Sequence, residues 1–189
     1  MILPRRRDLL SALLDAHSPA DDKERADLER MRALARTLPE PFSRHQLPGY
    51  FTGSAVVVDG AAERILYVLH RRLGRWLQPG GHSELEDGGF LELTALREAQ
   101  EETGCRVVLH PSAPRPLDVD VHPIPPKKGE PPHEHFDVRF LVVAVDPESA
   151  AHDPAESHEC RWFEWEEAER SADDEPLRRL LRKARQSAR

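Results

Sequence analysis

Three glutamates near the end of one segment are the residues whose types and spacing could do chemistry. At about 100° per residue, Glu98, Glu101 and Glu102 fall within about 100° of arc on a helix. Leu93 and Leu96 turn toward the other side of the same helix. The pattern therefore predicts a helix that packs one face and presents three carboxylates on the other.

This carboxylate face is unfavourable by local electrostatics. Like charges at positions i and i+4, here Glu98 and Glu102, cost roughly 0.2–0.5 kcal/mol, and acids in the last turn oppose the helix dipole by roughly 0.3–1 kcal/mol each. Gly104, a residue favoured at a helix C-terminal cap, follows closely. Arg97 can pair with Glu101, but one arginine cannot neutralise three acids. Where local rules are broken without local compensation, a functional site is the expected cause.

A divalent cation bound at this face would balance the charge. Magnesium takes hard oxygen ligands, retains several waters and commonly completes its shell with substrate phosphates, so a carboxylate cluster beside a glycine turn suits it. The sequence therefore indicates metal-assisted attack of water on a phosphate compound. The alternative is an acidic, solvated helix face. The turn Pro79-Gly80-Gly81, together with Arg97 and Gly104, favours the metal site.

The segment from Gly81 to Cys105 resembles the signature of the Nudix hydrolase family, G-x5-E-x7-R-E-U-x-E-E-x-G-U, in which U is apolar. Residues 97–105 match the second half throughout, and Gly81 fits the opening glycine. In the first half, a two-residue insertion around Gly88-Gly89, with aspartate in place of glutamate, is the simplest interpretation. The fourth acidic position is then open among three candidates: Glu84, Glu86 and Asp87.

The resemblance implies roles for individual residues of the segment. Glu98, Glu101 and Glu102 would hold Mg²⁺ or Mn²⁺, and the Gly80 carbonyl would be a further ligand. Asp87 is an additional candidate ligand. Arg97 would orient the glutamates, and Glu101 or Glu102 would also help to deprotonate water.

At the level of the whole chain, the resemblance implies an α/β fold, a Nudix-like α/β/α sandwich with a mixed sheet, over roughly residues 50–170. The implied activity is hydrolysis of the diphosphate linkage in a nucleoside diphosphate joined to another group X, by water attack on phosphorus. Two other functions remain open on the same fold. One is a non-catalytic nucleotide-binding regulator, which the three retained glutamates disfavour. The other is a prenyl diphosphate isomerase, whose expected cysteine and histidine arrangement is not evident.

Other candidates lie outside the glutamate cluster. His82 follows the glycine turn and could contact a phosphate or transfer a proton, or could be a plain loop residue. Glu134 and Glu156 are candidate general bases, because the family does not fix that role at one position. A second metal site could be formed by Asp118, Asp120, His122 and the run 133–135. A polar sheet face and a loop are the favoured interpretation of those residues.

The hydrophobic pattern predicts the elements that must position these side chains. We expect residues 1–45 to form a helical N-terminal extension, and the resemblance implies that residues 46–189 form the Nudix domain. We expect a hairpin of strands 54–58 and 65–70, a helix at 90–103, and a final helix at about 174–187. Further strands are expected at 106–109, 117–121, 136–145 and 161–165, with a proline-rich surface loop at 123–132.

Composition narrows the class of protein. The formal net charge of the 189 residues is −7, and residues 81–104 alone contain seven acids and one arginine. The sequence has no stripe of basic residues, which argues against general nucleic-acid binding. The longest apolar run, 140–145, is too short to span a membrane. We expect a cytoplasmic protein with a small nucleotide-like substrate and with Cys105 and Cys160 as reduced thiols. The basic run 178–189 is interpreted as a solvated helix end, and the N-terminal segment as packing or a homodimer surface.

Overall fold

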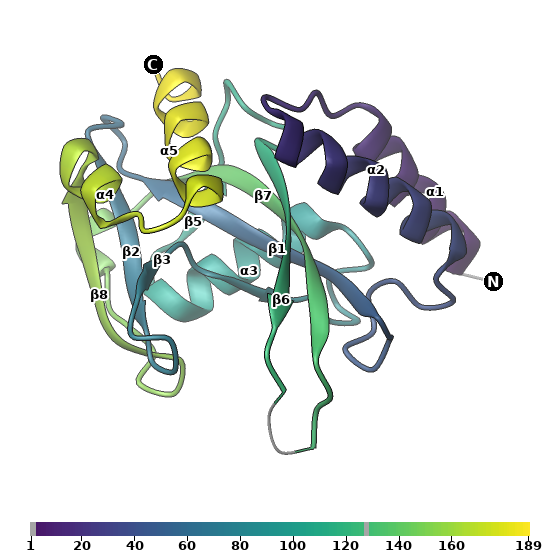
Figure 1. Ribbon diagram of the computed structural model, residues 1–189. Helices are drawn as coiled ribbons and strands as arrows, with labels where there is room; N and C mark the ends of the chain where they lie inside the picture. Colours follow the sequence, from purple (N-terminus) through teal and green to yellow (C-terminus); the bar gives the residue numbers. More distant parts are fainter. Residues whose placement is uncertain (1–2, 127–128) are drawn as a thin grey trace.

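A computed structural model describes residues 3–126 and 129–189. Residues 1–2 of the predicted N-terminal extension and 127–128 of the predicted proline-rich loop lie outside the described residues. The described chain contains one mixed sheet with helices on both faces (Figure 1). Its strands are β1 Gly49–Val58, β2 Arg64–His70, β3 Trp76–Leu77, β4 Gly80–His82, β5 Val107–Leu109, β6 Asp118–Ile124, β7 His133–Ala144 and β8 Ser157–Glu164.

Strand β1 organises the sheet, because it pairs along both of its edges. It runs parallel to β7, from Gly49 opposite Glu134 to Val58 opposite Val143. On its other edge it pairs antiparallel with β4 at its beginning and with β2 at its end. Strands β6 and β5 pair with β7, and β3 and β8 pair with β2. The hairpin predicted from residues 54–70 is confirmed.

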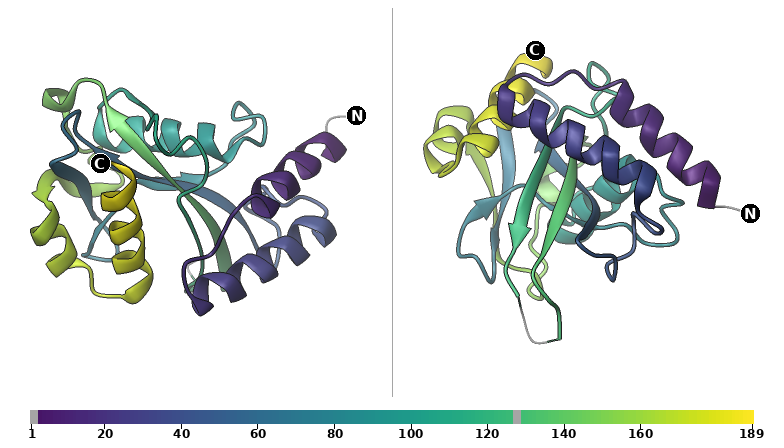
Figure 2. Two further views of the ribbon diagram at one scale, coloured as in Figure 1. Left: turned by 90° about the horizontal axis from the view of Figure 1, so that it is seen from above. Right: turned by 45° about the vertical axis from the view of Figure 1, so that its right-hand side comes forward.

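Five α-helices surround the sheet in the described chain. Helix α3 lies on one face, and α4 and α5 lie on the opposite face, which gives the predicted α/β/α layers (Figure 2). None of these helices is long and apolar enough to cross a membrane. Their bounds are α1 Leu3–Asp15, α2 Asp22–Thr37, α3 Leu91–Thr103, α4 Trp165–Ser171 and α5 Glu175–Ser187, with a short 3₁₀ helix at Pro147–Ser149.

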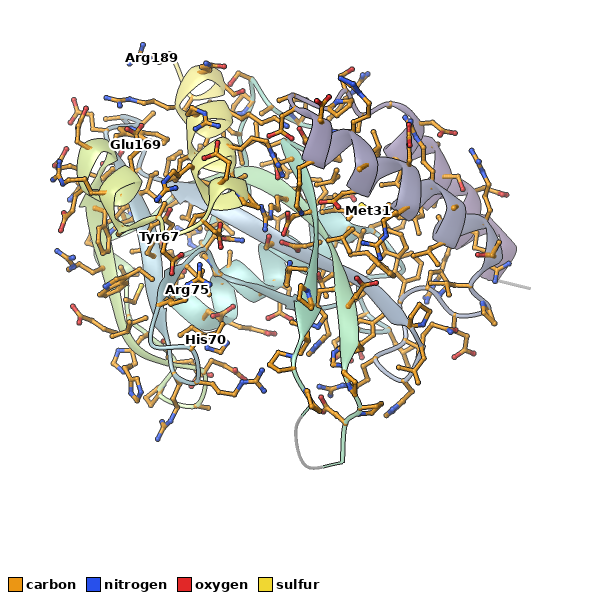
Figure 3. All side chains as sticks on the ribbon, in the orientation of Figure 1. Met31, Tyr67, His70, Arg75, Glu169 and Arg189 are labelled. Atoms are coloured by element: carbon orange, nitrogen blue, oxygen red, sulfur yellow. The ribbon has the colours of Figure 1, made fainter. Side chains whose placement is uncertain are left out.

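Two hydrophobic clusters hold the layers together, one on each face of the sheet. Because side chains alternate along a strand, β1 contributes Phe51 to the first cluster and Val56 to the second. The first cluster also contains Met31 of α2, labelled in Figure 3, and Leu91 of α3. The second contains Leu180 of α5. Helices α1 and α2 therefore share one core with β1 and α3.

Two elements differ from the sequence expectation. Trp165 was expected to end a strand, but it begins α4, and its indole N–H donates to the Ala62 carbonyl at 2.9 Å. Part of the proline-rich segment is strand, because β6 continues to Ile124, which lies opposite His133 of β7. Pro123 is tolerated there because β6 is an edge strand, where a missing N–H interrupts no second ladder.

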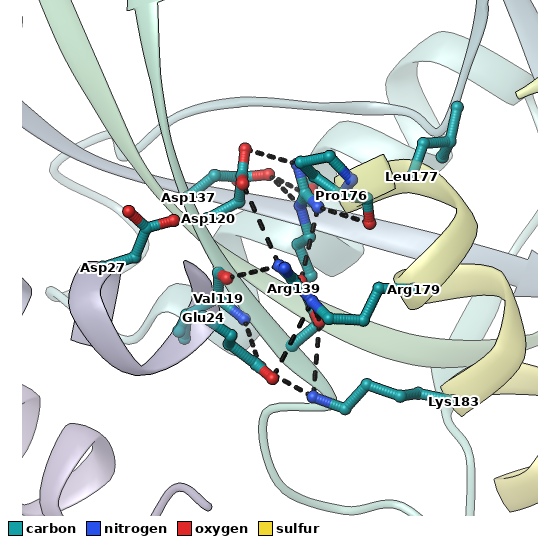
Figure 4. A network of polar contacts seen from close by, with 12 residues as sticks. Glu24, Asp27, Val119, Asp120, Asp137, Arg139, Pro176, Leu177, Arg179 and Lys183 are labelled. Atoms are coloured by element: carbon teal, nitrogen blue, oxygen red, sulfur yellow. Dashed lines mark hydrogen bonds and ion pairs between the residues drawn. The ribbon is translucent and has the colours of Figure 1, made fainter. Parts of the chain in front are cut away.

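The basic run near the C-terminus is not simply a solvated helix end, and that prediction is wrong for two of its residues. The helical period turns Arg179 and Lys183 toward β6 (Figure 4). Arg179 is 2% exposed and donates to Asp118 at 2.7 and 2.9 Å. The Lys183 ammonium lies 2.7 Å from the Glu24 carboxylate of α2. These ion pairs connect α5 to β6 and to α2.

Candidate active site

Two glycines of β4 let the edge of the sheet approach the second half of α3. A Cβ atom on Gly81 would lie 2.6 Å from the carboxylate atoms of Glu98, so a larger residue here would require this carboxylate to move. The neighbouring Gly80 N–H donates to Glu102 Oε1 at 2.7 Å. Gly104 ends α3 in the left-handed conformation with φ of 69°, as predicted. Two of the three glutamates are thus in contact with the glycine turn.

Asp87 is the acid that pairs with Arg97. It is 3% exposed and accepts hydrogen bonds from Arg97 Nε at 3.1 Å, Arg97 Nη2 at 3.0 Å, Thr94 Oγ1 at 2.9 Å and the Glu84 N–H at 2.9 Å. Burial opposes ionisation, but these hydrogen bonds hold the pKa of Asp87 below its usual value. The other two candidates for this position, Glu84 and Glu86, are exposed.

The extra residues of the first half of the signature form a turn next to Asp87. Gly88 and Gly89 have φ values of 64° and 84°, in the region that favours glycine. The Phe90 N–H donates to the Asp87 carbonyl at 2.9 Å, and α3 begins immediately afterwards. The two-residue insertion is therefore absorbed in the turn before the helix, without displacing Arg97 from Asp87.

Arg97 donates hydrogen bonds to four residues of the site. Its Nη1 donates to Glu98 Oε1 at 3.0 Å and to Glu101 Oε2 at 2.8 Å, while its Nη2 donates to the His82 carbonyl at 2.7 Å. With Asp87 on its remaining edge, the guanidinium fixes the loop, the helix and β4 relative to one another. This agrees with the orienting role that the sequence resemblance implies.

Glu98 and Glu102 are carboxylates whose environment opposes ionisation, and Arg97 does not offset this for both. Burial raises the pKa of Glu98 above its usual value. Burial also raises the pKa of Glu102 to about 8, and the charges of Glu98, Glu156 and Asp153 add to the effect. Glu101 is exposed and points toward solvent from the last turn. The unfavourable helix face predicted from the sequence is therefore present, and it is partly buried.

This oxygen-rich donor set fits a hard divalent cation. Within residues 3–126 and 129–189, no three histidine, cysteine or acidic side chains are already grouped as a metal site. Arg97 holds the carboxylates of Glu98 and Glu101, and the Gly80 N–H holds that of Glu102. Glu98 shares its arginine with Glu101 and Asp87, and Glu102 accepts from an uncharged N–H, so Mg²⁺ or Mn²⁺ would supply positive charge that these desolvated carboxylates need.

The two candidate general bases lie in different places. Glu134 of β7 forms an ion pair with Arg30 of α2 at 2.6 Å. Glu156 lies in the segment before β8, whose Asp153 N–H donates to the Glu102 carbonyl at 3.3 Å. The charge of Glu156 acts on Glu102 and helps to raise its pKa. Of the two residues, Glu156 is the one associated with the glutamate cluster.

His82 belongs to a group of histidines centred on Tyr50, a residue that no sequence pattern indicates. The Tyr50 hydroxyl lies 3.0 Å from His82 Nε2, 3.2 Å from His133 Nε2 and 3.1 Å from His135 Nε2. We call these four residues the Tyr50 cluster. Its assembly depends on the parallel register that sets Tyr50 opposite His135, which no local pattern reveals.

The two acids of the suspected second metal site are paired with cationic side chains of the protein. Asp118 and Asp120 are buried on β6 and pair with Arg139 at 3.3 and 3.0 Å. His122 Nδ1 lies 3.1 Å from Asp120 Oδ2. Lys23 of α2 also pairs with Asp120. This arrangement is the polar sheet face that was favoured from the sequence, stabilised by buried ion pairs.

Solved structures with the same fold include proteins that are named for their action on different phosphate compounds. An Ap4A hydrolase of C. elegans, in a binary complex, aligns with 70% of this chain and 93% of its own at 20% identity and a TM-score of 0.52. The E. coli dihydroneopterin triphosphate pyrophosphohydrolase aligns with 70% and 92% at 14% identity and a TM-score of 0.52. A UDP-X diphosphatase aligns with 99% and 93% at 20% identity and a TM-score of 0.51, so that likeness includes α1 and α2.

Sequence comparison gives the family directly. Comparison with curated proteins finds no match. The family model described as the NUDIX domain matches residues 50–184, which covers most of the chain and includes β1, the glycine turn, α3 and both helices that follow β8. The chain belongs to the Nudix family of hydrolases that act on phosphoanhydride bonds.

Proposed function

We propose that the protein is a Mg²⁺-dependent hydrolase that cleaves the diphosphate linkage of a nucleoside diphosphate joined to a group X, by attack of water on phosphorus. The observation that carries this proposal is the pair of carboxylates, half-buried Glu98 and buried Glu102, that contact the glycine turn and whose pKa values are both raised. A diphosphate substrate and a divalent cation together match the charge of such a site.

The proposed ligands are Glu98, Glu101, Glu102 and the Gly80 carbonyl, and Mn²⁺ is an alternative to Mg²⁺. When bound, the metal would supply Lewis-acid stabilisation of the charge that develops on the phosphoryl oxygens. The geometry supports Asp87 as the positioning partner of Arg97, because its oxygens already accept from four donors. Arg97 in turn orients Glu98 and Glu101.

Water is deprotonated, in this proposal, by a carboxylate at the edge of the cluster. Glu101 is exposed and held by Arg97, while Glu156 approaches from the segment before β8. Glu102 is a further candidate base from the sequence, but the Gly80 N–H accounts for one of its oxygens. His82 is proposed to contact the substrate, since its carbonyl is fixed by Arg97 at the edge of the site.

The experiment is a substrate panel of nucleoside diphosphate derivatives assayed with Mg²⁺. Wild type should release product from at least one compound, and a Glu101→Gln/Glu102→Gln double variant should lose that activity. Glu86→Gln is the matched control, because Glu86 is an exposed acid on the neighbouring loop. Absence of product from every compound, with wild type equal to the double variant, contradicts hydrolysis. Tight binding without turnover at any metal concentration would instead support a regulator.

A further inference from the structure

A pocket of about 440 Å³ lies where β6 ends and β7 begins. Its size falls in the range of small-molecule sites, roughly 300–1,000 Å³. It is formed by the strand ends on either side of the hairpin and by the residue that precedes β1. Its walls include Pro48, Pro123, Ile124, Pro125, Pro132 and His133. Four of the seven described lining residues, 123–125 and 132, come from the proline-rich segment that the sequence assigned to a surface loop.

The walls favour a flat, uncharged group over a phosphate. Proline rings carry no N–H donor and have few conformations to lose, so they form a rigid apolar surface that gains dispersion contacts with a planar ring. Among the described residues, the lining contains no lysine or arginine that could neutralise an anion. Its one acid, Glu134, is paired with Arg30 at 2.6 Å. A heteroaromatic ring, such as a nucleobase, has the matching shape and polarity.

The Tyr50 cluster lies between the pocket and β4. His133 in the pocket wall stacks on Tyr50 with ring centroids 5.3 Å apart and an interplanar angle of 23°. The Tyr50 ring lies another 5.3 Å from the ring of His82. His82 directly follows Gly81, above which the Glu98 carboxylate lies. Two ring-to-ring steps therefore separate the pocket from β4, a span comparable to that of a ribose with its phosphates.

Hydrogen bonding makes His133 a fixed part of the wall. Its Nδ1 lies 3.0 Å from the Pro131 carbonyl, which can only accept, so Nδ1 carries a proton. In a neutral His133, Nε2 is then the acceptor, and the Tyr50 hydroxyl donates to it at 3.2 Å. The oxygen of Tyr50 is left to accept from the other imidazoles of the Tyr50 cluster. The ring orientation of His133 is thus set from both sides.

We propose that this pocket binds the nucleobase of the substrate, while the diphosphate lies at the glutamate cluster and the sugar lies along the Tyr50 cluster. The inference rests on the proposed function, since it names the part of the substrate that occupies a second region of the same site. It assigns a binding role to the described residues at the end of β6 and the start of β7.

The test measures binding of analogues that cannot be hydrolysed, by titration calorimetry with Mg²⁺ on the full chain. The probes are the α,β-methylene diphosphates of adenosine, guanosine, uridine and cytidine, and base-free methylenediphosphonate. Wild type should bind at least one nucleoside analogue about tenfold or more tightly than the base-free probe, as expected for one stacked base. Ile124→Arg should remove that gain by filling the pocket, and Ile124→Ala should reduce it by about threefold. Val108→Arg is the control, because Val108 is 49% exposed on β5.

Three results would overturn the inference: equal binding of the base-free probe and all four nucleoside analogues, no binding of any analogue, or an unchanged base-dependent gain in a folded Ile124→Arg variant. Folding of each variant is checked by its thermal unfolding midpoint. Because the analogues are not hydrolysed, the outcome is independent of turnover. Base-dependent binding together with no hydrolysis of any substrate would contradict the proposed function alone.

Discussion

Binding of Mg²⁺ should displace a proton from Glu102. Burial and the charges of Glu98, Glu156 and Asp153 together raise the pKa of this carboxyl to about 8, against the hydrogen bond from Gly80 that lowers it. The metal-free protein therefore holds Glu102 mostly protonated at pH 7. A metal ligand must be the carboxylate, so binding is coupled to deprotonation.

The size of the effect follows from the pKa. If one proton is displaced, the apparent association constant for Mg²⁺ rises about tenfold per pH unit well below pH 8 and levels off above it. Between pH 6 and pH 8 the expected increase is about 50-fold. The same shift destabilises the metal-free fold as pH rises, because above about pH 4.5 the unfolded chain loses a proton that the folded chain keeps up to about pH 8.

Calorimetric titrations with Mg²⁺ at pH 6, 7, 8 and 9 test this coupling. Repeating each titration in two buffers of different ionisation enthalpy counts the protons released. Glu102→Gln should lower the affinity and release fewer protons, whereas Glu86→Gln should behave as wild type because Glu86 is exposed. An affinity that does not change between pH 6 and pH 9, with no proton passed to the buffer, would refute the reasoning.

Three further predictions concern stability and the positions of the site residues. Arg179→Met should lower the free energy of unfolding by about 3–5 kcal/mol, because it leaves buried Asp118 without its bidentate partner. Arg182→Met is the control and should cost no more than about 1 kcal/mol, because the ion pair of Arg182 is exposed. Equal losses in the two variants, measured by urea unfolding, would contradict the buried role of Arg179. Asp87→Asn should reduce kcat by roughly 10- to 100-fold by loosening Arg97, and a rate equal to wild type in steady-state assays argues against that pairing. Gly81→Ala should weaken Mg²⁺ binding, because its methyl group would occupy space 2.6 Å from the carboxylate atoms of Glu98; calorimetry that finds unchanged affinity contradicts this.

Features set by neighbouring residues could be predicted from the sequence. The helix at 91–103 and its glycine cap follow from composition and from one residue with freedom at positive φ. The hairpin of β1 and β2 follows from two apolar runs around a turn. The acidic face of α3 was also readable, because its three glutamates are spaced at helical intervals. The family resemblance rested on this same local segment.

Features that depend on long-range pairing could not be predicted. The parallel pairing of β1 with β7 joins segments about 85 residues apart in sequence and gathers the Tyr50 cluster. Arg179 finds Asp118 across 61 residues, so a basic run that looked solvated is partly buried. The pairing of Asp87 with Arg97 required the loop geometry, because the sequence pattern left the fourth acidic position open among three acids.

The structure contains two buried groups of carboxylates, and they differ in their cations. On β6, burial alone would favour protonation, but the charge of Arg139 lowers the pKa of Asp120 below its usual value. On α3, the single arginine is shared among Asp87, Glu98 and Glu101, and the pKa of Glu102 stays raised. The first group is balanced by the protein itself and serves stability. Only the second group needs a cation from outside, which is why we place the metal there and not on the polar face of the sheet.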